Sequence, residues 1–241
     1  MRQPHCWLWM AAVGMSDWRT FSSSAELDKA LTDYLGQRLQ DRVTSAGRAS
    51  LAVSGGSTPA ALFGGLSQYR LDWSRVDITL VDERWVATDS DQSNERLVRD
   101  TLLQKHAVVA NFVGLKSSAE SATLGVAEAT GRVIGLSLPF SAVVLGMGED
   151  GHTASWFPQA SNLQTLLDPQ GSALVAATAP VTAPHQRITL TLAAVLNSLE
   201  IVIHITGAKK RAVLESALAE DYPVAAVLKQ DSTPVSIWWA P

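Results

Sequence analysis

One histidine lies in a glycine-rich segment where an apolar run ends. Residues 143–158 read Val-Val-Leu-Gly-Met-Gly-Glu-Asp-Gly-His-Thr-Ala-Ser-Trp-Phe-Pro. The pattern predicts a buried strand at residues 141–145 that opens into an exposed loop, and ligands of open parallel sheets bind at such loops. A lone histidine often satisfies only local backbone groups. The flanking glycines and a helix start expected at residues 153–155 favour His152 as a functional residue.

The same segment matches a dinucleotide-binding pattern, Gly146-x-Gly148-x-x-Gly151. However, two acidic residues at 149 and 150 lie where a pyrophosphate would have to approach the loop amides. We therefore disfavour a dinucleotide-dependent oxidoreductase, and a titration without NAD or NADP binding would exclude it.

A small polar loop, Ser54-Gly55-Gly56-Ser57-Thr58-Pro59, joins an apolar strand at residues 49–53 to a helix at residues 59–67. Thr58 is expected as the helix N-cap and Pro59 as the first helical residue, and the glycines let the backbone approach a ligand closely. Free amides at a helix N-terminus bind anions, which favours phosphate binding by this loop over an ordinary strand-to-helix turn. The Gly-Lys-Ser/Thr ending of a nucleotide P-loop is missing.

Two further strand ends carry charge. Asp82-Glu83-Arg84 follows a strand at residues 76–81, where Arg84 could grip a phosphate or carboxylate and an acid could orient it. Lys209-Lys210-Arg211 follows a strand at residues 200–206, and three cations at a helix N-terminus cost stability unless an anion is near. From these stretches alone, a solvated surface cluster remains an equal alternative for each.

Strands and helices are expected to alternate along 241 residues, which predicts one α/β domain. Apolar positions 27, 31, 35 and 39 define one buried helix face, with a capping signal before it. The expected helices are residues 25–45, 59–67, 94–104, 119–134, 212–218 and 222–228, with a short helical link at 192–199. The expected strands are residues 49–53, 76–81, 111–115, 141–145, 174–177, 187–192, 200–206 and 235–239. Residues 1–14 are interpreted as a disordered or non-essential extension, and residues 15–241 as the domain.

Composition narrows the class of protein. Hydrophobic residues make up 46% and charged residues 17% of the chain, and the net charge is −4, so no basic footprint for nucleic acid exists. No apolar run approaches the roughly 20 residues that span a bilayer, so we expect no membrane partner. The single cysteine, Cys6, fits a reducing compartment, and we expect a cytoplasmic protein.

Taken together and in order, the segments 54–59, 82–86, 146–155 and 206–210 resemble the 6-phosphogluconolactonase family, within the group that also holds the glucosamine-6-phosphate isomerases. The resemblance implies a doubly wound, mostly parallel sheet with helices on both faces. It also implies hydrolysis of 6-phospho-D-glucono-1,5-lactone to 6-phosphogluconate, the second step of the oxidative pentose phosphate pathway. The expected partner is this sugar phosphate lactone, the expected state a monomer or weak homodimer, and no cofactor or metal is expected.

The resemblance also assigns roles to particular residues. His152 matches the catalytic histidine, which would take a proton from the attacking water and pass it to the departing ring oxygen. Asp150 would shape the loop and polarise that histidine. The expected substrate and phosphate contacts are Gly55, Gly56, Ser57, Thr58, Asp82, Arg84, Arg187 and Lys210. Lys209 remains an alternative to Lys210.

Rival functions differ at identifiable positions. In the isomerases a glutamate stands five residues after the histidine, where this chain has Phe157, and an aromatic residue replaces Arg84. Both differences favour the lactonase, with the isomerase as the alternative. A non-catalytic sugar-phosphate sensor would leave His152 without a role, and a serine esterase lacks its Gly-x-Ser-x-Gly elbow here.

Overall fold

The middle strands of the central sheet are made mostly from apolar runs of the sequence, and nearly all of their side chains are buried, whereas neither edge strand has a buried residue. The computed structural model describes residues 17–241; the expected extension at residues 1–14 lies outside this range. The strands are β1 Asp17–Thr20, β2 Ala49–Val53, β3 Val76–Leu80, β4 Asp82–Arg84, β5 Asn111–Val113, β6 Ala142–Leu145, β7 Val175–Thr178, β8 Arg187–Leu190, β9 Ile201–Thr206 and β10 Val235–Ala240. The helices are α1 Ser24–Ala46, α2 Ala60–Gln68, α3 Asn94–Thr101, α4 Ala122–Ile134, α5 Leu163–Leu166, α6 Leu192–Leu196, α7 Ala208–Ser216 and α8 Ala225–Lys229, with 3-10 turns η1 Trp73–Arg75 and η2 Lys105–Val109.

Seven strands form a parallel sheet in the order β1-β10-β9-β6-β2-β3-β5. The chain moves from β2 toward β5 in one direction and from β6 toward β10 in the other. The order therefore reverses between β2 and β6, where Val53 pairs with Val144. Open α/β sheets bind ligands at such a switch point, beyond the carboxyl ends of the strands.

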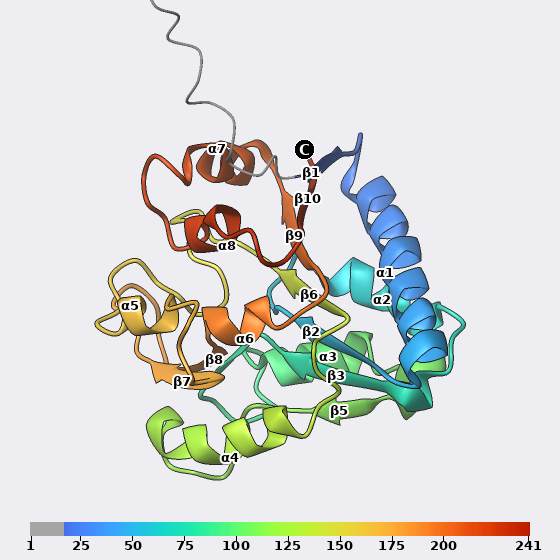
Figure 1. Cartoon of the computed structure of the whole chain (residues 1–241), viewed down its shortest axis with the longest axis horizontal. Helices are drawn as coiled ribbons and strands as arrows, with labels where there is room; N and C mark the ends of the chain where they lie inside the picture. Colours follow the sequence, from blue (N-terminus) through green and yellow to red (C-terminus); the bar gives the residue numbers. More distant parts are fainter. Residues whose placement is uncertain (1–16) are drawn as a thin grey trace, which may run out of the picture.

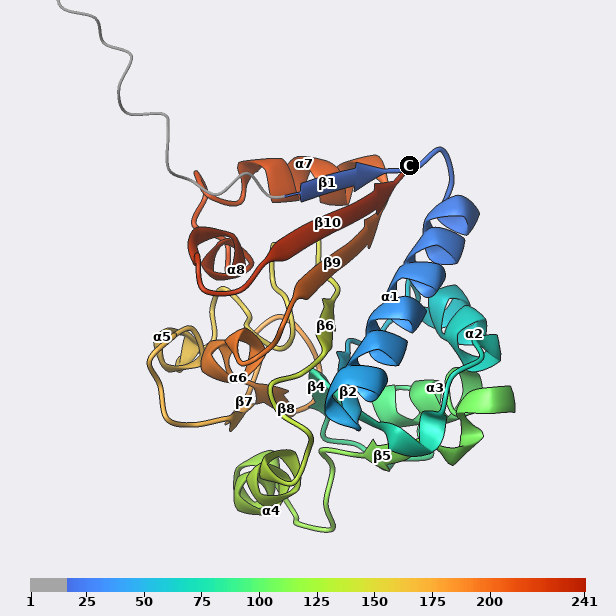
Figure 2. The ribbon, with the colours of Figure 1, turned by 45° about the vertical axis from the view of Figure 1, so that its right-hand side comes forward.

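Helices cover both faces of this sheet, as expected for a doubly wound fold. Helices α1, α2 and α3 lie on one face, and α4, α6, α7 and α8 lie on the other (Figures 1 and 2). The longest helix, α1, buries the leucines at 27, 31, 35 and 39 completely. Its N-terminus is capped as predicted: Ser23 Oγ accepts from the Glu26 amide at 3.2 Å, and the Glu26 carboxylate accepts from the amide of Ser22, the residue before the N-cap, at 3.0 Å.

A second, antiparallel sheet of three strands, β4-β8-β7, packs beside α4. The sequence predicts strands near β7 and β8 without assigning them to a sheet, and it treats residues 82–84 as the end of β3. Instead these residues form β4, with Asp82 opposite Thr189 and Arg84 opposite Arg187. The small sheet thus brings the charged strand end next to a residue about a hundred positions later in the chain.

Two local predictions are wrong. No helix starts at residues 153–155, because Ala154 has a positive φ of 49° and Thr153 forms an isolated antiparallel bridge with Trp156. The segment is a tight turn instead. The N-cap of α2 falls on Pro59 rather than Thr58, and its side chain cannot accept a hydrogen bond from the first helical amides.

Candidate active site

A cavity of about 240 Å³ lies at the switch point, beyond the carboxyl ends of β2 and β6. Eight of the ten predicted site residues line it: Gly55, Gly56, Ser57, Thr58, Asp82, Arg84, His152 and Lys210. The other two, Asp150 and Arg187, are not among the lining residues: Asp150 is exposed beside His152, and Arg187 is buried. Four loops that are distant in sequence therefore converge on one space.

His152 and Asp150 form a close pair at the cavity. The Nδ1 atom of His152 lies 2.5 Å from Oδ1 of Asp150, and the same oxygen accepts from the His152 backbone amide at 3.3 Å. The ring of Phe157 stacks on the imidazole with centroids 4.4 Å apart. With Nδ1 directed at a carboxylate, Nε2 is the nitrogen that remains for proton transfer. The side chain of His152 is 29% exposed, which leaves it open to a ligand.

The glycines around this pair have packing and conformational causes. A Cβ on Gly148 would lie 2.3 Å from the His152 ring and 2.5 Å from the Asp150 carboxylate, so only glycine leaves room for the pair. Gly151 has a φ of 76°, and a Cβ there would also clash with Tyr222. These contacts account for Gly148 and Gly151 of this loop without a dinucleotide.

The small polar loop at residues 54–59 presents unpaired amides to the cavity. Its first residue is fixed, because Ser54 Oγ accepts from the Gly146 amide at 3.1 Å. Within residues 17–241, no group accepts a hydrogen bond from the amides of residues 55–58. Gly56 has a φ of 101° and open space around it. Free amides ahead of the α2 N-terminus form an anion site that fits a phosphate.

Only one of the two candidate lysines faces this site. Lys210 is half-buried and lines the cavity, and burial lowers its pKa from the usual 10.5 while the nearby Glu149 carboxylate opposes that shift. The side chain of Lys209 is 83% exposed, and its Nζ lies 4.0 Å from Glu149. Geometry therefore favours Lys210 as the cation that meets an anionic ligand.

Arg84 and Asp82 reach the cavity from β4. Arg84 lines the cavity, and its guanidinium donates to the Gln92 carbonyl at 2.7 Å. Asp82 is buried, and its Oδ2 accepts from Ser155 Oγ at 2.5 Å. Ser155 belongs to the loop at residues 146–155 that carries His152, which we call the histidine loop. Asp82 therefore links this loop to β4.

Glu83, the acid between them, does not line the cavity. Its carboxylate accepts from the amides of Asn94 and Glu95 at 2.8 and 2.7 Å and from Ser93 Oγ at 3.0 Å. Burial raises the pKa of Glu83, and these hydrogen bonds act in the opposite direction. Glu83 thus caps helix α3 instead of orienting a ligand.

Arg187 does not line the cavity. Its side chain is buried, and Nη1 donates to the His185 carbonyl at 2.7 Å and to the Pro184 carbonyl. Its guanidinium carbon lies 5.9 Å from the centre of the Phe157 ring, the ring that stacks on His152. Burial lowers the pKa of Arg187, and the Asp82 carboxylate opposes this shift. Arg187 therefore lies close to Asp82, Arg84 and Phe157 without lining the cavity itself.

Three residues of the site were not anticipated from sequence. Asn94 and His204 line the cavity although each is at most 3% exposed, and Phe157 packs on the histidine ring. Asn94 is expected from sequence only at a helix start, and His204 lies within an apolar strand. Neither position carries a local sequence signal for a role in the cavity.

The described chain offers no cluster of three or more histidine, cysteine or acidic side chains that could hold a metal ion. Across residues 17–241, none of the helices has the length and apolar character needed to cross a bilayer. The fold and the cavity define an α/β enzyme that combines an anion-binding loop, a lysine and a histidine–aspartate pair at a topological switch point.

The chain belongs to the family described as glucosamine-6-phosphate isomerases/6-phosphogluconolactonase, whose family model matches residues 22–238. A 6-phosphogluconolactonase from Rhizobium meliloti (strain 1021) is 44% identical over 225 residues, which cover 92% of this chain and 97% of the relative. One from Pseudomonas aeruginosa is 40% identical over 235 residues, covering 96% of each chain. The crystal structure of a 6-phosphogluconolactonase from Shewanella baltica OS155 is 45% identical, with a TM-score of 0.92 over 95% of this chain and 99% of that one.

Proposed function

We propose that this chain hydrolyses 6-phospho-D-glucono-1,5-lactone to 6-phosphogluconate, with His152 as the general base. The observation that carries the proposal is the His152–Asp150 pair, which shares one cavity with the free amides of residues 55–58. The names of the relatives support the substrate, since the proteins from Rhizobium meliloti and Pseudomonas aeruginosa are both called 6-phosphogluconolactonases. The reaction would be the second step of the oxidative pentose phosphate pathway.

The phosphate end of the substrate binds to the loop at residues 55–58. Amides ahead of the α2 N-terminus donate to its oxygens, and Lys210 and Arg84, which line the same cavity, act as counter-cations. Held at this end, the lactone extends toward His152, because the loop and the imidazole line the same cavity. Positioning of this kind converts the attack on the carbonyl into an effectively unimolecular step.

The chemistry requires one proton carrier. His152 Nε2 removes a proton from water as its oxygen attacks carbonyl carbon C1, which forms a tetrahedral oxyanion. When that intermediate collapses, the bond between C1 and the ring oxygen breaks, and the imidazolium returns the proton to the ring oxygen. Asp150 holds the Nδ1 proton and stabilises the imidazolium between the two steps. Phe157 fixes the plane of the ring.

The glucosamine-6-phosphate isomerases of the same family would need further carboxylates to move protons between carbons. At the position where the isomerases carry a glutamate, this chain has Phe157, whose ring stacks on the imidazole of His152. This contact favours hydrolysis over isomerisation.

The decisive test is an assay on freshly made lactone. Product is coupled to NADP reduction by 6-phosphogluconate dehydrogenase, and the spontaneous rate is subtracted. We expect a rate far above background that falls at least about 100-fold in His152→Ala. The exposed His106→Ala serves as the matched control and should retain the full rate. No rate above background would overturn the function, and an isomerase assay would follow; full activity of His152→Ala would overturn the base.

We further propose that the enzyme is cytoplasmic and acts as a monomer or weak homodimer without a metal or cofactor. Light scattering over a range of protein concentrations checks the oligomeric state. Retention of the full rate after dialysis against a chelator checks the metal.

A further inference from the structure

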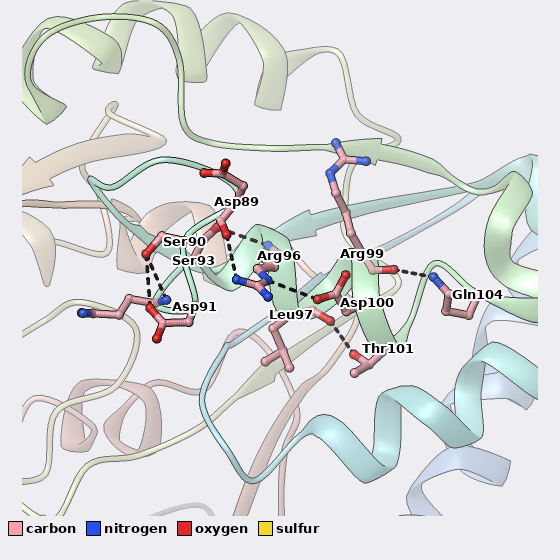
Figure 3. Close-up of polar contacts among 11 residues, drawn as sticks. Asp89, Ser90, Asp91, Ser93, Arg96, Leu97, Arg99, Asp100, Thr101 and Gln104 are labelled. Atoms are coloured by element: carbon pink, nitrogen blue, oxygen red, sulfur yellow. Dashed lines mark hydrogen bonds and ion pairs between the residues drawn. The ribbon is translucent and has the colours of Figure 1, made fainter.

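Asn94 is the first residue of helix α3. Its side chain lies between Asp82 and the small polar loop at residues 54–59, which we call the phosphate loop. Asn94 is only 2% exposed, yet it lines the cavity. Its backbone amide donates to Glu83 Oε1 at 2.8 Å, and Ser93 Oγ accepts from the Arg96 amide at 3.2 Å. Arg96 also donates to the Asp89 carbonyl at 2.8 Å and lies 3.3 Å from Asp100, so the start of α3 is held in place (Figure 3).

The orientation of the Asn94 carboxamide is fixed by its nitrogen. Nδ2 donates to the Asp82 carbonyl at 2.8 Å and lies 3.3 Å from the Asp82 carboxylate. A flipped amide would place its oxygen against these two acceptors, so Oδ1 must point the other way. In this position Oδ1 is buried and finds no hydrogen-bond partner among the described residues.

The oxygen points at the phosphate loop. A Cβ built on Gly55 would lie 1.9 Å from Asn94 Oδ1 and 2.2 Å from its Cγ. The carboxamide therefore fills the space that a side chain at position 55 would need. The next residue, Gly56, has open space on its own side, toward the cavity. Asn94 thus contacts the loop at Gly55, while the adjacent Gly56 lines the cavity.

The support continues to the catalytic histidine loop. Asp82, which holds the Asn94 nitrogen, accepts from Ser155 Oγ at 2.5 Å, and Ser155 lies three residues after His152. A buried acceptor without a partner costs stability, and such a group in a native structure calls for an explanation. A functional role for Asn94 in aligning the phosphate loop with the loop that carries His152 provides this explanation.

We propose that Asn94 is a positioning residue for the phosphate end of the substrate, because its side chain sets the Gly55 backbone of the anion-binding loop relative to Asp82 and the histidine loop. The proposal rests on the proposed function for the identity of the substrate. It does not depend on that function for the binding of phosphate itself. Asn94 does not need to touch the reacting atoms.

The test uses the close fit between the Asn94 side chain and the backbone of Gly55. Gly55→Ala places a methyl group against Asn94 and should weaken binding of inorganic phosphate at least about tenfold, since the loop must move away. Asn94→Ala should also weaken it, because the loop loses its support. The double variant Gly55→Ala/Asn94→Ala should bind phosphate more tightly than Gly55→Ala alone, because the methyl group occupies the space that the carboxamide leaves. Calorimetric titration with inorganic phosphate measures all three.

Two controls separate positioning from a purely structural role. Gly64→Ala, on α2, has nothing within 4 Å of the added Cβ and should bind phosphate as the unmodified chain does. Asn94→Ala should raise KM for the phosphorylated lactone while kcat/KM for unphosphorylated glucono-1,5-lactone stays within about twofold, because only the first substrate uses the loop. If Asn94→Ala does not fold, Asn94→Ser takes its place in both measurements.

Additive losses in the double variant, or equal losses on both lactones, would overturn the proposal. Phosphate titration reports on the loop even if the lactone proves not to be the substrate. A failed turnover assay with an intact rescue of phosphate binding would therefore refute the proposed function and leave the role of Asn94 standing.

Discussion

The Oδ1 atom of Asp150 accepts hydrogen bonds from two groups of His152, the ring Nδ1 at 2.5 Å and the backbone amide at 3.3 Å. One carboxylate oxygen therefore fixes both the imidazole and the turn that carries it. This relationship makes the tautomer of His152 depend on the charge of Asp150.

Replacing Asp150 with Asn is expected to lower kcat by about 10- to 1,000-fold. The amide can donate to Nδ1, which moves the ring proton to Nε2 and removes the base from the cavity. Steady-state kinetics on the lactone measure the effect, and Asp231→Asn, at an exposed acid, is the control. A kcat within twofold of the unmodified enzyme would show that Asp150 only shapes the loop.

Lys210→Ala is expected to raise KM for the phosphorylated lactone by about 10- to 100-fold, which is what loss of a charge-assisted hydrogen bond costs. Lys209→Ala is the natural control, because the neighbouring lysine extends into solvent beside Glu149. It should change KM less than about twofold. The reverse ranking would assign the phosphate to Lys209.

Affinity for phosphate should fall as the solution becomes alkaline, and earlier than for a site with an exposed lysine. Burial lowers the pKa of Lys210 below 10.5, so the ammonium form that attracts phosphate is lost as pH rises through this lowered value. Lys210→Arg should retain affinity to higher pH, because a guanidinium stays charged. Titration with inorganic phosphate at several pH values between about 7 and 10 tests this. Identical pH profiles for the two proteins would contradict it.

Glu83→Gln is expected to lower the free energy of unfolding by about 1–3 kcal/mol, because the carboxylate accepts from two amides and a hydroxyl at the start of α3. Urea unfolding measures the difference. Glu95 is also on α3, but within residues 17–241 its side chain bonds only to Arg99, so Glu95→Gln provides a smaller reference loss.

The same pair of proteins has a predicted pH dependence. The folded-state pKa of Glu83 is raised above 4.5, so its contribution is full below that value and is lost as pH rises through the folded pKa. The stability advantage over Glu83→Gln should therefore shrink as pH rises above 4.5. An advantage that grows over this range would mean that the hydrogen bonds outweigh burial.

Much of this architecture could be predicted from the sequence. Apolar runs that end in glycines or charged residues predicted β2, β3, β6 and β9. Because parallel strands end at the same edge of the sheet, these polar ends lie close together. The free amides after β2 and the histidine after β6 follow from that rule. The leucine spacing of α1 likewise predicted its buried face.

Other features depend on contacts that no local pattern records. The three-residue strand β4 is charged, so it does not resemble a strand until it pairs with β8. The Asn94 side chain packs against Gly55, which lies far away in the sequence, so no local pattern reveals the contact. The position of Arg187 outside the cavity lining, with Nη1 donating to the carbonyls of Pro184 and His185, also has no sign in the sequence pattern. The expected helix at residues 153–155 gave way to a turn because Ala154 adopts a positive φ.

The pairing of β1 with β10 sets an order of events during synthesis. In the parallel sheet β1 contacts only β10, so the first described strand has no partner until residues 235–240 have left the ribosome. The strands around the cavity, by contrast, can pair earlier because β2, β3 and β6 are complete by residue 145. The loop at residues 55–58 can thus assemble on the nascent chain before the sheet is completed at its β1 edge.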